Sequence, residues 1–189
     1  AMLNAFPNVE VRVFNPFTLR RLRTLSYLVD FPRINRRMHN KSFSVDGVAT
    51  VVGGRNIGDI YFARDAETQY SDFDILATGA VVDAVAADFD AYWNSESAYP
   101  HELLVAPAAE AEQDFADALR AMLDATGNET YRDALVDSML VRDMVAGHLV
   151  LEWAPIRLLS DDPAKGLGRA PAGTLLMSAL VPLLGQARE

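Results

Sequence analysis

The chain has 189 residues, half of them hydrophobic, with no cysteine and a formal net charge of −9. The lack of cysteine excludes disulfide bonds and thiolate metal sites, and the three separated histidines have no metal-ligand spacing, so neither a metal nor a cofactor is expected. No run of about 18 apolar residues occurs, so no membrane-spanning helix is expected.

The charge is unevenly distributed along the chain. Residues 1–64 contain ten Lys and Arg against four Asp and Glu, whereas the remainder contains seven against 22. A basic approach draws in anionic substrates, and it suits an anionic lipid surface or a nucleic-acid backbone equally well. The acidic remainder argues against a broad nucleic-acid-binding face.

The first elements are a short strand and a helix. Val9–Phe14 alternates as a strand that ends at Asn15-Pro16. Thr18–Asp30 has leucines three residues apart and arginines on other faces, which predicts a helix that Phe31-Pro32 ends. A basic amphipathic helix of this kind can rest on a membrane, and it can equally be an ordinary helix packed on a core.

A β-hairpin is predicted next. Asp46-Gly47 separates two alternating apolar runs, and this dipeptide favours a type I′ turn. A two-residue turn would pair Val45 with Val48 and place His39 opposite Gly54. Gly54 would then leave a gap beside the imidazole where a substrate can approach.

The same register predicts a cluster of polar side chains. Cross-strand partners share a face, so His39, Lys41 and Asn56 should project from one side of the hairpin, while Asn40 points the other way. This set suits a phosphodiester, because the histidine can attack phosphorus while the lysine and the amide hold its oxygens.

An acidic group should orient the imidazole of His39 and stabilise its cation. Asp46 lies roughly 23 Å away along an extended strand at about 3.3 Å per residue, so it is expected to be a structural turn residue. Asp72 and Asp74 are the candidates, because they lead into the predicted strand Phe73–Thr78.

The rest of the chain is predicted to be mostly helical. Residues 59–70 read as a loop, in which Asp59 and Tyr61 are candidates to shape the mouth of a pocket. Val81–Trp93 carries an apolar stripe that predicts a core-packed helix: Val82, Val85, Phe89 and Trp93. The later predictions are a loop at Asn94–Pro100, helices at Pro107–Thr126 and Asn128–Gly147, a strand-like run at His148–Trp153, a turn at Asp161–Pro163 and a helix at Thr174–Leu184.

These motifs resemble those of the phospholipase D superfamily. His39, Lys41 and Asp46 match its His-x-Lys-x4-Asp signature, and Asn56 matches its Gly-x-x-Asn element. The longer stretches Asn35–Phe43, Gly53–Asp59 and Tyr92–Ser95 resemble the bacterial cardiolipin synthase C-type branch.

The resemblance implies an α/β fold in which a mixed β-sheet is flanked by helices. Residues 1–100 would form part of a first phospholipase D-like lobe, and residues 101–189 a helical extension and connector. The chain has one motif where the family mechanism needs two. We therefore expect an internal fragment that lacks a second lobe.

The resemblance also implies roles for the site residues. His39 would be the nucleophile that forms a phosphohistidine, with Lys41 and Asn56 as phosphate ligands. Asp74 fits the spacing of the histidine-orienting acid better than Asp72. The flanking residues expected to contact the substrate are Arg37, Gly54 and Arg55.

The implied activity is phosphatidyl transfer, with cardiolipin made from phosphatidylglycerol. The expected partners are an anionic phospholipid, a membrane surface, and a second motif from another lobe or a homodimer partner. The expected location is peripheral, at the cytoplasmic face of the bacterial inner membrane. The alternatives are a homodimeric nuclease of the superfamily, and an incomplete fragment that binds an anionic headgroup without turnover.

Overall fold

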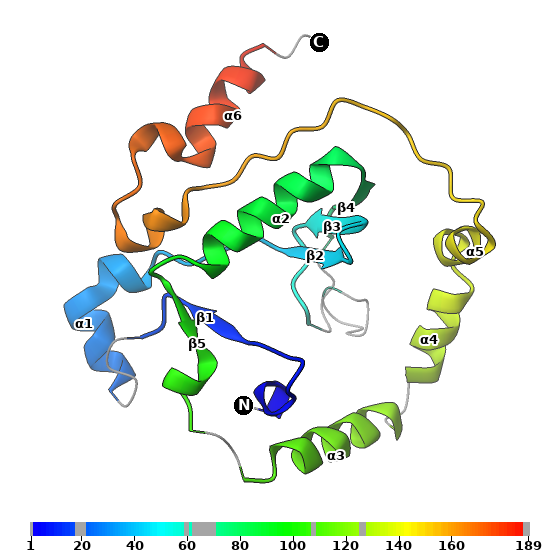
Figure 1. Cartoon of the computed structure of the whole chain (residues 1–189), viewed down its shortest axis with the longest axis horizontal. Helices are drawn as coiled ribbons and strands as arrows, with labels where there is room; N and C mark the ends of the chain where they lie inside the picture. Colours follow the sequence, from blue (N-terminus) through cyan, green and yellow to red (C-terminus); the bar gives the residue numbers. More distant parts are fainter. Residues whose placement is uncertain are drawn as a thin grey trace. The chain divides into compact units, whose positions relative to one another are not determined.

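A computed structural model describes residues 2–17, 22–58, 61, 71–106, 109–124 and 128–186. The chain divides into two compact units (Figure 1). The motif unit consists of residues 11–104 and 156–189, and the helical unit of residues 1–10 and 105–155. The predicted division into a first lobe at residues 1–100 and an extension at residues 101–189 refers to a longer protein, and it stays a prediction.

A three-stranded antiparallel sheet forms the centre of the motif unit. Its strands are β2 (Ser42–Val45), β3 (Ala49–Gly53) and β4 (Asp74–Thr78), in the order β2-β3-β4. The turn prediction is confirmed: Asp46 and Gly47 both have positive φ, and the Val48 N–H donates to the Val45 carbonyl at 2.9 Å.

The predicted register is wrong by one residue. Val45 pairs with Ala49 rather than with Val48, and Ser42 pairs with Val52. Val48 is an exposed residue that follows the turn and has no cross-strand partner on β2. The observed register lets the buried Thr50 hydroxyl meet the Ser44 hydroxyl at 2.8 Å.

Helix α2 (Ala80–Trp93) packs on this sheet, as Figure 1 shows. Val82 and Val85 are buried as predicted, but Phe89 is half exposed and Tyr92 is buried in its place. Phe89 instead stacks on Trp93, with ring centroids 5.4 Å apart. The buried stripe of the helix is therefore rotated toward Tyr92.

A second, two-stranded antiparallel sheet joins β1 (Arg12–Phe14) to β5 (Ala98–Pro100). The expected loop at Asn94–Pro100 is thus partly a strand. Helix α1 (Arg23–Ile34) is broken by a kink at Asp30, where φ and ψ are non-helical, so the helix predicted to end at Asp30 does end there, and a further helical turn continues through Pro32 to Ile34. Residues 18–21, where that helix was predicted to begin, lie outside the described residues.

The last segment of the motif unit returns to α2. It contains the 3-10 helices η4 (Pro163–Leu167) and η5 (Ala172–Thr174), followed by α6 (Leu176–Leu184). The predicted turn at Asp161–Pro163 becomes the start of η4, where the Asp162 carboxylate accepts the Ala164 N–H at 2.8 Å.

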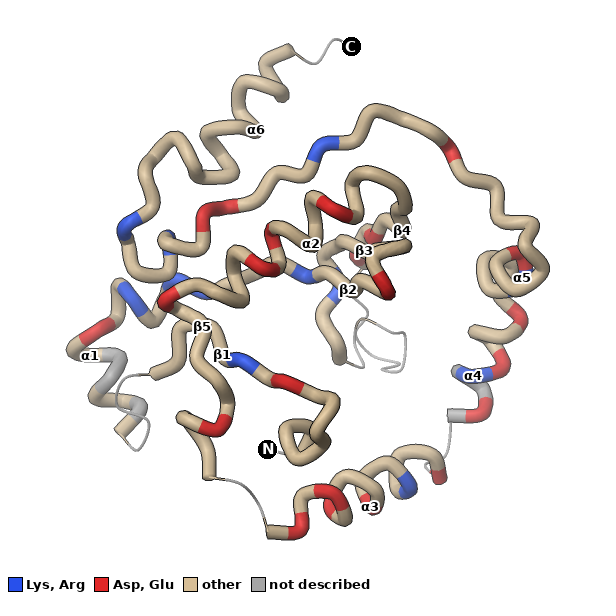
Figure 2. Tube along the Cα trace, in the orientation of Figure 1, with Lys and Arg blue, Asp and Glu red and all other residues tan. Residues whose placement is uncertain are grey.

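In the helical unit, residues 1–10 pack against helices formed by residues 105–155. Its elements are the 3-10 helix η1 (Met2–Ala5), α3 (Ala111–Asp124), α4 (Asn128–Val136) and α5 (Met139–Ala146). Phe6 packs edge-to-face on Phe115, with centroids 5.2 Å apart. Figure 2 shows acidic residues along these helices.

Two predictions fail in the helical unit. The single helix predicted at Asn128–Gly147 is interrupted at Asp137, because Ser138 caps a new helix by accepting the Val141 N–H. The run His148–Trp153 does not pair as a strand.

In the motif unit, a short 3-10 helix, η3 (His101–Leu103), follows β5.

The α/β class is confirmed, and every strand pair among the described residues is antiparallel. Across the part of the chain that the structure describes, each helix is too short or too polar to span a bilayer.

Candidate functional site

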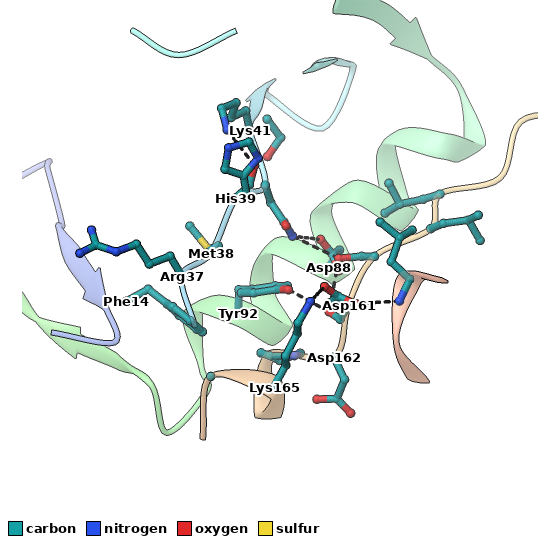
Figure 3. Close-up of a pocket in the computed structure, with 18 of the residues that line it drawn as sticks. Phe14, Arg37, Met38, His39, Lys41, Asp88, Tyr92, Asp161, Asp162 and Lys165 are labelled. Atoms are coloured by element: carbon teal, nitrogen blue, oxygen red, sulfur yellow. Dashed lines mark hydrogen bonds and ion pairs between the residues drawn. The ribbon is translucent and has the colours of Figure 1, made fainter. Parts of the chain in front are cut away.

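His39 and Lys41 lie just before β2, in a segment without regular secondary structure that leads in from α1. Figure 3 shows their side chains on one side of this segment. The Lys41 ammonium donates to the backbone oxygen of His39 at 2.9 Å, and the His39 side chain is exposed. The two side chains thus lie on one side as predicted, but on an irregular segment rather than on a strand of the hairpin.

Lys41 lies beside Gly53 rather than Val52, because the Gly53 N–H donates to the Lys41 carbonyl at 3.2 Å. Gly53 in turn pairs with Asp74 on β4. The three residues form one row across the sheet, so Asp74 shares a face with Lys41.

Gly53 allows the Asp74 carboxylate to lie over β3, since a Cβ on Gly53 would collide with Asp74 Oδ1. Asp74 therefore leans over Gly53, the residue next to Lys41. The expected open gap at Gly54 is not present, because the Asp72 carboxylate occupies the space where a Cβ of Gly54 would lie. With the register shifted, Gly54 also no longer faces His39.

Arg55 holds Asp74 in place. Its Nε donates to Asp74 Oδ2 at 2.7 Å, and its Nη1 donates to the Tyr61 carbonyl. The hydrogen bond from the Arg55 side chain lowers the pKa of the Asp74 carboxyl, although burial acts in the opposite direction. Arg55 is thus engaged with the protein, and its predicted contact with substrate stays a prediction.

Asn56 is exposed, and its amide donates to the Tyr61 hydroxyl at 2.8 Å. Tyr61 therefore lies next to a predicted site residue, while Asp59 lies outside the described residues. For Asn56 to hold a phosphate oxygen, its amide must exchange the Tyr61 hydroxyl for that oxygen.

A cavity of about 300 Å³ adjoins the segment that carries the motif (Figure 3). Of the predicted site residues, Arg37, His39 and Lys41 line it, whereas Gly54, Arg55, Asn56 and Asp74 do not. Asp46 stands at the turn, as expected of a structural residue.

The cavity also contains residues that sequence reasoning did not select: Asn40, Asp88, Tyr92, Ser160 and Asp161. Period-two alternation placed Asn40 on the face opposite His39. Its partners could not be identified from the sequence, because Asp88 and Ser160 are 48 and 120 residues away.

Asp161 organises the far wall of the cavity. Its carboxylate accepts the Leu176 N–H at 2.7 Å and pairs with Lys165, and its carbonyl accepts the Tyr92 hydroxyl at 2.9 Å. Burial tends to raise the pKa of Asp161, but the bonds from Lys165 and Leu176 outweigh it and the pKa is lowered. Burial raises the pKa of the Tyr92 phenol.

No group of three or more metal-ligating side chains occurs within the described ranges. The motif residues themselves offer a nucleophilic imidazole and a cation side by side, which is chemistry suited to an anionic ester.

The chain is similar to bacterial lipid-synthesising enzymes. It is 46% identical over 194 residues to cardiolipin synthase C of Escherichia coli K12, an alignment that includes all of this chain and 40% of that protein. It is 33% identical over 99 residues to the major cardiolipin synthase ClsA of Bacillus subtilis 168, which is 52% of this chain and 19% of that protein.

An uncharacterized protein of Helicobacter pylori 26695 is 44% identical over 105 residues, 54% of this chain and 21% of that protein. The chain thus spans less than half the length of these relatives. No family model and no solved structure matches it.

Proposed function

This chain is a homologue of the bacterial cardiolipin synthases of the phospholipase D superfamily, and from that premise we propose that it supplies the nucleophilic half of a phosphatidyltransferase. The observation that carries the proposal is the placement of the His39 and Lys41 side chains on one side of the same segment. The similarity of the whole chain to part of the E. coli enzyme supports a phospholipid substrate, with cardiolipin made from phosphatidylglycerol.

The transfer takes place in two steps. The His39 ring nitrogen attacks the phosphorus of the donor lipid, the phosphorus–oxygen bond to the departing alcohol breaks, and a phosphohistidine forms. The departing oxygen takes a proton from a histidine of a second motif. That histidine then removes the proton of the acceptor hydroxyl, whose oxygen attacks phosphorus while the nitrogen–phosphorus bond breaks.

The remaining site residues stabilise this reaction. Lys41 neutralises the charge that develops on the phosphoryl oxygens, and Asn56 donates to them after leaving Tyr61. Asp74, which leans over Gly53 toward the motif segment, fixes the imidazole of His39 and stabilises its cation. The second motif comes from another lobe of the same protein or from a homodimer partner.

The substrate reaches this site from a membrane surface. Basic residues surround the motif, among them Arg36 and Arg37 on the segment before His39, and they attract an anionic lipid. We place the protein peripherally at the cytoplasmic face of the inner membrane.

The first test uses the full-length protein with phosphatidylglycerol vesicles and mass spectrometry of the lipid products. The wild type should form cardiolipin, and His39→Ala should form none, because the nucleophile is gone. His148→Ala, a histidine in the helical unit, is the matched control and should retain activity. Cardiolipin from the His39→Ala variant, or no lipid product from a folded wild type, would contradict the proposal.

Lys41→Ala tests the phosphate ligand in the same assay. We expect kcat to fall by about 10²- to 10³-fold, the usual loss when one group that stabilises a transition state is removed. Circular dichroism should show an unchanged fold, since Lys41 makes its side-chain bond to the carbonyl of the nearby His39. A rate within a few-fold of the wild type would remove Lys41 from the site.

A further inference from the structure

Asn40 lies between the two motif residues, and its side chain bonds to groups outside the motif. Its amide contacts Asp88 of α2, which Figure 3 labels in the wall of the cavity. The amide nitrogen donates to Ser160 Oγ at 3.1 Å and lies 3.4 Å from Asp88 Oδ2. One side chain thus joins the motif segment to a helix and to the segment that returns to that helix.

The segment that carries His39 has little support from the sheet. Residues 36–41 precede β2, whose paired residues begin at Ser42. The Asn15 amide holds the Arg36 carbonyl at 2.7 Å at one end, and the Gly53 N–H holds the Lys41 carbonyl at the other. Asn40 provides an attachment between these ends, next to the nucleophile.

The two partners of the Asn40 amide, Asp88 and Ser160, lie next to residues that are bonded or packed within the motif unit. Ser160 precedes Asp161, whose carboxylate and carbonyl are bonded to Lys165, Leu176 and the buried Tyr92. Asp88 stands one turn before Tyr92 on α2, the helix that packs on the sheet. Both acceptors of the Asn40 amide therefore belong to elements that are bonded or packed within the motif unit.

We propose that Asn40 is a positioning residue that holds the His39 ring and the Lys41 ammonium in their reactive placement by tying their backbone to Asp88 and Ser160. The inference rests on the proposed function and adds to it a residue that does not touch substrate. A misplacement of about 1 Å in reacting groups can reduce a rate by about 100-fold, so a loose anchor should reduce kcat without weakening substrate binding.

The test exchanges the two partners. Asn40→Asp places a second carboxylate against Asp88 and repels it. Asp88→Asn in the same protein restores one amide and one carboxylate with their positions exchanged. Asn94→Asp, at the exposed end of α2, makes the same change of charge outside the anchor and is the matched control.

We expect Asn40→Asp in the full-length protein to reduce kcat for cardiolipin formation by about 10- to 100-fold with KM unchanged. The double variant should return to within about threefold of the wild type. Asn94→Asp should be unchanged. A normal kcat in Asn40→Asp, or a loss that Asp88→Asn does not restore, would overturn the proposal.

Hydrogen exchange gives a second readout that does not depend on lipid turnover. The Gly53 amide, which donates to the Lys41 carbonyl, should exchange faster in Asn40→Asp and return toward the wild-type rate in the double variant. If Asn40→Asp does not fold, Asn40→Ala must show the same faster exchange. Unchanged exchange in Asn40→Ala would contradict the proposal that Asn40 holds the motif segment. A wild type without lipid activity would contradict the proposed function. The exchange result would still show whether Asn40 holds the motif segment in place.

Discussion

At the scale of single residues, Arg55 and Asp74 join the ends of two strands beside the motif. The ion pair has an Nε–Oδ2 distance of 2.7 Å, and both side chains are partly exposed. The arginine lowers the pKa of the aspartate, so the charged carboxylate is favoured in the folded state. The pair therefore makes stability depend on pH.

The sign of that dependence follows from the lowered pKa. Asp74 contributes stability above the ordinary aspartate value of 3.8, and this contribution is lost as the pH falls through the lower pKa of the folded state. We expect Asp74→Asn to lower the melting temperature at pH 6 and to match the wild type in acid below the folded pKa. Asp90→Asn, an exposed residue on α2, is the control. A difference for Asp74→Asn that persists in acid would contradict this assignment.

At the scale of elements, two glycines of the hairpin have different roles. Gly47 has φ +66°, and a Cβ there would meet no atom within 4 Å. Gly53 instead provides space, because the Asp74 carboxylate and the Phe73 carbonyl lie where its Cβ would be. A side chain at Gly47 strains the turn, whereas one at Gly53 displaces the acid beside the motif.

Alanine substitutions should separate these roles. Gly47→Ala should cost about 1–2 kcal/mol of stability from left-handed backbone strain, and it should keep the acid-dependent contribution of Asp74. Gly53→Ala should cost about 1–3 kcal/mol and abolish that contribution, because Asp74 can no longer reach Arg55. Denaturant unfolding at pH 3 and pH 6 measures both. An unchanged pH dependence in Gly53→Ala would contradict the close approach.

At the scale of the whole molecule, the motif unit is built from two segments far apart in the sequence. The second segment, residues 156–189, supplies Ser160 and Asp161 to the cavity wall and closes over Tyr92. The segment that carries the motif and the helix α2 thus contact residues that follow the helical unit in the sequence.

Truncation after Pro155 tests this dependence. We expect amides in α2 near Val85 and Tyr92 to lose protection from hydrogen exchange, because the Tyr92 hydroxyl loses its acceptor and its cover. Amides of α3 in the helical unit serve as the internal control and should change little. Equal protection of α2 in the truncated and the untruncated chain would show that residues 156–189 do not support the site.

The sequence determined the local features of this protein. The Asp46-Gly47 turn, the alternation that puts His39 and Lys41 on one side, and the helix packed on the sheet all follow from backbone preferences and side-chain period. The motif itself, and with it the expected relatives, required no structure.

Only the tertiary structure decided the features that join distant segments. The one-residue register shift places the Ser44 hydroxyl beside the buried Thr50 hydroxyl, and such a shift changes which side chains meet. The hydrogen bond from Asn40 to Ser160 joins residues 120 positions apart, and the ion pair between Arg55 and Asp74 joins the ends of two strands 19 positions apart. Local preference carries no information about such contacts, because they form only when the sheet, α2 and the final segment pack together.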